Sequence, residues 1–112
     1  MSEIDQVAHE IERSTFELIV PLQTTKEIKQ DAFVALDKAA RDLARLLKGS
    51  ELIPRKILAN LDMAAGILEA EAPYSRDQAL VLEMSRKLRL SFGLILGGEC
   101  QEDRQPGAPR VR

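Results

Sequence analysis

The sequence predicts an all-α protein, a four-helix up-down-up-down bundle with an irregular C-terminal tail. Four segments of the 112 residues place apolar side chains at the 3.6-residue period of an amphipathic helix. Val, Ile, Thr and aromatic residues never form the alternating run that indicates a strand. The links between the four segments are short, which favours antiparallel neighbours. A more orthogonal array with the fourth helix at its centre is the alternative.

The composition predicts a single domain, residues 1–98, followed by a tail, residues 99–112. A chain of this length buries about two thirds of its unfolded surface, so it needs no disulfide or metal to fold. The only cysteine, Cys100, excludes an internal disulfide, and no leader sequence is recognisable at the start of the chain. We therefore expect a cytoplasmic protein. The apolar run from Leu88 to Leu96 is too short to span a bilayer, so no membrane partner is expected.

The first predicted helix runs from about Ser2 to Val20. Pro21 is expected to end or kink it, because the proline ring clashes with the preceding turn. The second helix is predicted to start at Thr24, with Glu27 completing a capping box, and to stop at Gly49. Its alanines allow a close approach of neighbouring helices.

An acidic docking face is predicted on the first helix. Residues 1–20 carry five acidic side chains and one basic side chain. Acidic residues in the first turn suit the helix dipole, but Glu10 and Glu17 lie beyond its reach. Together with Glu3 they predict a surface for a basic partner, and an ordinary solvated face is the alternative.

The third helix is predicted to begin at Pro54 and to run to about Ala72. The fourth is predicted to run from Ser75, which forms a capping box with Gln78, to a left-handed stop at Gly97 and Gly98. This fourth helix is apolar on two sides and therefore needs two covers. The domain core provides one, and we expect a partner to provide the other.

A protein interface is predicted on the backs of the third and fourth helices. Met63 and Ile67 fall off the core stripe of the third helix, and Leu90 and Leu94 fall off that of the fourth. The short link 73–75 should make the two helices antiparallel neighbours. The four side chains would then form one exposed apolar patch, which usually marks a contact. Scattered exposure or deeper burial is the alternative.

The tail, from Glu99 onward, has no apolar period and contains two prolines, one glycine and six charges that cancel. Such a composition is typical of an extended or disordered segment. The alternative is a segment that lies along the bundle or along a partner.

The sequence predicts no enzymatic activity and no metal or cofactor. The only histidine, His9, follows no acid at ligand spacing and is expected at the surface. One histidine and one cysteine exclude a Cys/His zinc site within the chain, and a catalytic Cys–His pair would require the tail to reach the first helix. The glycines form no phosphate-binding loop, and no carboxylate lies in an apolar stripe where burial would raise its pKa.

A helix-turn-helix DNA binder is the least favoured interpretation. Gly49 lies in a turn between two predicted helices in the segment Leu43–Leu61. However, Arg45 occupies the position where that motif has a small residue. The net charge of −2, with both signs interspersed, also lacks the basic footprint of a nucleic-acid binder, so no nucleic-acid partner is expected.

The function that these observations favour is a small non-catalytic protein-interaction module that acts as a homodimer. The alternative is a cytoplasmic immunity-type protein that neutralises a basic toxin through its acidic first helix. That alternative rests on size, charge and the lack of catalytic groups, which is an analogy and not a motif.

Overall fold

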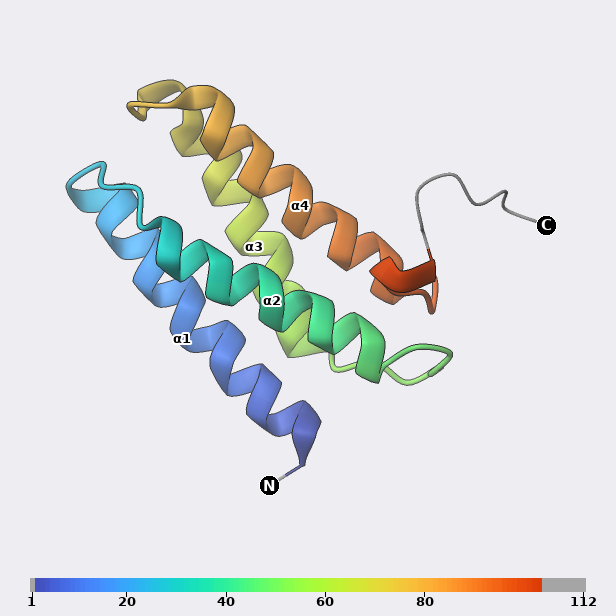
Figure 1. Ribbon diagram of the computed structural model, residues 1–112. Helices are drawn as coiled ribbons and strands as arrows, with labels where there is room; N and C mark the ends of the chain where they lie inside the picture. Colours follow the sequence, from blue (N-terminus) through green and yellow to red (C-terminus); the bar gives the residue numbers. More distant parts are fainter. Residues whose placement is uncertain (1, 104–112) are drawn as a thin grey trace.

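The computed structural model describes residues 2–103 and confirms the all-α four-helix bundle (Figure 1). Its helices are α1 (Glu3–Thr24), α2 (Gln30–Leu46), α3 (Arg55–Glu71) and α4 (Gln78–Leu96). Two short 3₁₀ helices follow α3 and α4, namely η1 (Ala72–Tyr74) and η2 (Gln101–Asp103). Successive helices reverse direction along the bundle, so α1 and α3 run the same way (Figure 1).

The bundle consists of two stacked helical hairpins. α1 packs on α2, and α3 packs on α4; the hairpins meet where α1 contacts α3 and α2 contacts α4. All four helices contribute fully buried side chains, because each has an apolar stripe at helical spacing. The core includes Ile11, Leu18, Leu36, Leu43, Leu61, Leu68, Val81 and Leu88.

The turn between α1 and α2 differs from the prediction. α1 begins as expected, with the Ser2 hydroxyl accepting the Asp5 N–H at 3.1 Å, but it continues through Pro21 to Thr24. Thr24 does not cap a second helix, because it is the last residue of α1; its hydroxyl donates backwards to the Val20 carbonyl at 2.7 Å. Lys26 then takes a left-handed backbone conformation, and α2 begins only at Gln30.

The start of α4 also differs from the prediction. The Ser75 hydroxyl donates to the Ala72 carbonyl at 2.8 Å and so belongs to the preceding turn. Asp77 is the actual cap, since its carboxylate accepts the Leu80 N–H at 3.1 Å. The predicted capping box of Ser75 is therefore wrong, and α4 begins at Gln78.

The end of α4 is tied to the link after α2. Gly98 has a φ of 71°, the left-handed conformation that favours glycine, whereas Gly97 remains right-handed. The Gly49 N–H, in the 47–54 link, donates to the Gly98 carbonyl at 3.1 Å. This bond joins two segments far apart in the sequence at one end of the bundle.

The first residues of the predicted tail pack on the bundle. Cys100 is 2% exposed, and the Gln101 side-chain amide donates to the Ser91 hydroxyl at 2.7 Å. Asp103 accepts the Cys100 N–H at 3.0 Å and the Lys48 ammonium at 2.6 Å. The bundle thus extends to residue 103, whereas residues 104–112 lie outside the described part of the chain.

Removing the charge of Asp103 is expected to loosen this segment. The hydrogen bond from the Lys48 ammonium holds the pKa of Asp103 below its usual value, so the anchoring is complete at neutral pH. The contact should weaken as the pH falls from about 4, the ordinary pKa of an aspartate, toward the lowered pKa of Asp103, because the carboxylate is protonated there and loses its charge. At neutral pH we expect Asp103→Asn to make the buried Cys100 thiol react several-fold faster with a thiol reagent. An unchanged rate would show that Asp103 does not hold the segment, and Glu51→Gln serves as a control for charge removal elsewhere.

Candidate interaction surface

One side chain of the predicted interface belongs to the interior. Leu94 is 2% exposed, and its prediction as an interface residue is therefore wrong. The reason is the chain reversal after α4. The Glu99 N–H donates to the Leu94 carbonyl at 2.8 Å, and Gln101 covers the nearby Ser91, so residues 99–103 return over this side of α4.

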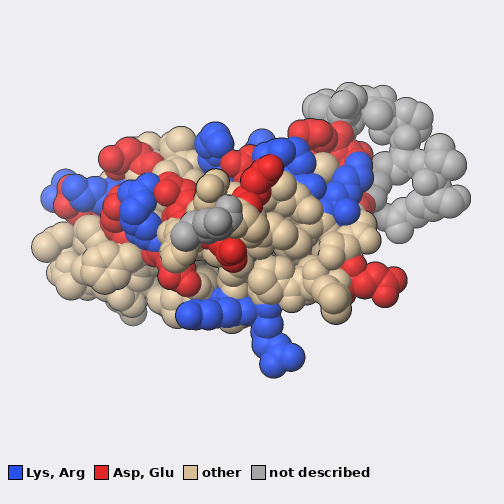
Figure 2. All heavy atoms as spheres, turned by 90° about the horizontal axis from the view of Figure 1, so that it is seen from below, with Lys and Arg blue, Asp and Glu red and all other residues tan. Residues whose placement is uncertain are grey.

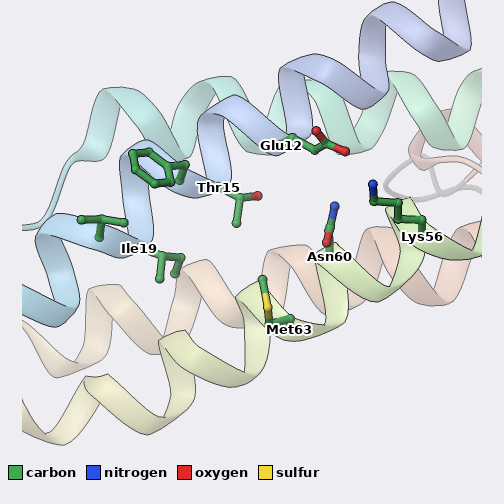
Figure 3. A pocket seen from close by; sticks show the side chains of 8 residues that line it. Glu12, Thr15, Ile19, Lys56, Asn60 and Met63 are labelled. Carbon is green, nitrogen blue, oxygen red and sulfur yellow. The ribbon is translucent and has the colours of Figure 1, made fainter.

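The remaining side chains of that predicted patch lie apart. The face of α3 that is turned to α4 carries Asp62 and Glu69, whose carboxylates both bind the Arg89 guanidinium. Met63 instead lies on the side of α3 that faces α1 (Figure 3). Leu90 is 43% exposed and lies two residues after the fully buried Leu88, on the outer side of α4. Helical geometry therefore separates Leu90 from Met63 and its half-buried neighbour Ile67.

The predicted acidic face of α1 is partly neutralised within the helix. The Arg13 guanidinium lies between Glu10 and Glu17, with its Nε 3.2 Å from the Glu10 carboxylate and Nη1 2.6 Å from that of Glu17. The hydrogen bond that Arg13 donates to Glu10, followed by the one that it donates to Glu17, raises the pKa of Arg13. Glu3 is exposed in the first turn. Two of the three predicted docking carboxylates thus already have a basic partner in the chain.

A hollow lies between α1 and α3 (Figure 3). Its volume is about 380 Å³, within the range of small binding sites. We call it the α1–α3 groove, and it is lined by Glu12, Thr15, Phe16, Ile19, Val20, Lys56, Asn60 and Met63.

The groove is polar at one end and apolar at the other. Figure 3 shows Glu12 on α1 and Lys56 on α3 at the same end, on opposite sides of the groove. Neither has an ion-pair partner among residues 2–103. Ile19 and Met63 lie toward the other end (Figure 3).

The wall of the groove contains an unsatisfied hydroxyl. Thr15 is 6% exposed, and its Oγ1 has no hydrogen-bond partner within the described chain. A buried polar group of this kind costs about 1–3 kcal/mol. Asn60, which faces the same groove from α3, is only half-buried.

Phe16 forms an apolar ridge beside the groove. It is 68% exposed, and a second hollow of about 390 Å³ lies on its other side, where Phe16, Val20, Pro21 and Ala32 meet Glu17, Lys29 and Asp31. Val20 is 38% exposed and lies one turn further along α1. Phe16 is not among the residues predicted for an interface, although its four-residue spacing to Val20 marks a second apolar row outside the core stripe.

The described residues contain no group of three or more His, Cys, Asp or Glu side chains arranged to hold a metal ion. His9 is exposed, as expected.

Acidic and basic side chains are interspersed on the face shown in Figure 2. Within residues 2–103, no helix has the length and apolar content needed to cross a membrane.

Comparisons with known proteins give this chain no relative. No family model matches it, and neither a curated protein nor a solved structure is significantly similar to it.

Proposed function

We propose that the protein is a small non-catalytic interaction module that acts as a homodimer through the α1–α3 groove. The observation that carries the proposal is Phe16, a large apolar side chain left 68% exposed beside a hollow. An aromatic side chain buries about 150–250 Å² when it is covered, so its exposure leaves a large part of the hydrophobic stabilisation unused. Val20 and Met63, which are 38% and 50% exposed, extend the same apolar surface.

A second copy of the chain suits this surface because the surface carries both a projection and a recess. In a two-fold dimer each copy presents the same patch, so the patch must be complementary to itself. Phe16 projects next to the groove, and the groove is mostly apolar around Ile19 and Met63. The patch also contains one acidic and one basic side chain, Glu12 and Lys56, that form no ion pair with another residue of the described range 2–103.

The test of the homodimer is the effect of Phe16→Asp on the oligomeric state. We expect the full chain to sediment as a dimer at tens of micromolar and the variant to sediment as a monomer. The melting temperature of the monomer should change little, because Phe16 is not part of the core. Val34→Asp is the matched control, since Val34 is 65% exposed on α2, away from the groove. A monomeric wild-type chain, or a variant that remains dimeric, would refute the proposal.

Two other functions have weaker support. An immunity-type protein would present the acidic face of α1 to a basic toxin, but a basic partner would have to displace Arg13 from Glu10 and Glu17. For a helix-turn-helix, the link 47–54 between α2 and α3 is eight residues long, whereas the motif uses a turn of about three to four residues. As a location we propose the cytoplasm, because the single Cys100 is a free thiol.

A further inference from the structure

The distribution of charge along the α1–α3 groove restricts how two copies can face each other. Glu12 and Lys56 lie at one end on opposite sides, and apolar side chains lie toward the other end (Figure 3). α1 and α3 run in the same direction (Figure 1), so residues 12–20 and 56–63 pass along the groove in the same order.

A two-fold axis that lies in the interface can be perpendicular or parallel to the groove, and the two orientations bring different side chains into contact. An axis perpendicular to the groove reverses its direction, which places Glu12 and Lys56 of one copy over Phe16 and Val20 of the other. Two charges would then lose water without gaining a partner, which is costly. An axis parallel to the groove keeps the direction and exchanges the two sides, so that α1 of each copy faces α3 of the other.

We propose that the two copies are related by a two-fold axis parallel to the groove, with Glu12 of each copy paired to Lys56 of the other. This inference rests on the proposed homodimer and adds its orientation. The same axis places Val20 of each copy near Met63 of the other, because Val20 follows Glu12 by about as many residues as Met63 follows Lys56. Charge pairs of this kind fix the register and select the partner more than they raise the affinity.

The orientation predicts a specific pattern of charge-reversal effects. Glu12→Lys places two lysines opposite each other on both sides of the two-fold axis, and Lys56→Glu does the same with two glutamates. Each single variant should therefore dimerise at least about tenfold more weakly. An equimolar mixture of the two variants should form a heterodimer, because both of its charge pairs are again of opposite sign. The double variant E12K/K56E should form a homodimer of wild-type affinity.

Sedimentation equilibrium of the full-length chains, with one variant labelled in the mixture, measures all four affinities. Glu51→Lys and Lys87→Glu are controls with the same changes of charge at exposed positions outside the groove; each should leave the affinity within about twofold. Suppose that the wild type dimerises, that Phe16→Asp abolishes the dimer, and that Glu12→Lys and Lys56→Glu, each measured by itself, behave like these controls. The orientation is then refuted and the homodimer stands. If the mixture is no tighter than its components, the orientation is refuted as well. If the wild type is a monomer, the proposed function itself fails.

Discussion

Leu94→Lys is expected to lower the free energy of unfolding by more than about 3 kcal/mol. Leu94 is 2% exposed, and a lysine there would place an unpaired ammonium in an apolar site. A domain of this size has a total stability of about 5–15 kcal/mol, so much of the population would be unfolded. Chemical denaturation followed by circular dichroism measures the loss.

Leu90→Lys is the matched control for that experiment. Leu90 lies on the same helix and is 43% exposed, so its ammonium remains in water and the free energy of unfolding should change by less than about 0.5 kcal/mol. A Leu94→Lys variant as stable as Leu90→Lys would show that residues 99–103 do not cover this side of α4 in solution.

Leu61→Ala is expected to lower the free energy of unfolding by about 2–5 kcal/mol. Leu61 is fully buried at the centre of α3, within the core cluster to which all four helices contribute. The shorter side chain loses its apolar contacts and leaves a cavity that close-packed neighbours fill only in part.

Leu52→Ala makes the same chemical change at an exposed position and so shows how much of the effect at Leu61 comes from burial. Leu52 is 87% exposed in the link before α3, so Leu52→Ala should change the free energy of unfolding by less than about 0.5 kcal/mol. Urea titrations of both variants give the comparison. Equal effects at the two positions would mean that the face of α3 carrying Leu61 is not the buried one.

Helical periodicity predicted the fold because each apolar stripe is a local property of its own segment. The helix boundaries were less predictable, because a hydroxyl can donate as well as accept. Thr24 and Ser75 both begin a pattern typical of a capping box, yet each donates backwards to a carbonyl of the preceding turn. Ser2 does cap its helix, and the sequence pattern alone does not separate these cases.

The candidate surface was less predictable still, because exposure depends on which neighbour covers each side of a helix. Met63 was recognised as lying off the core stripe of α3, but the stacking of the hairpins turns it toward α1 and not toward Leu90. Leu94 also lies off the main stripe of its helix, yet a segment predicted to be a tail covers that side. Phe16 was missed because the apolar row that it forms with Val20 is short and does not contribute to the core.

The division into two hairpins has a consequence for the speed of folding. α1 with α2, and α3 with α4, are neighbours in the sequence, so most of the helix contacts close short loops that lose little chain entropy. Proteins rich in such local contacts fold faster than those built from distant pairings. We therefore expect fast folding, in which the contacts between the two hairpins, including the bond between Gly49 and Gly98, close the longest loops and lose the most chain entropy.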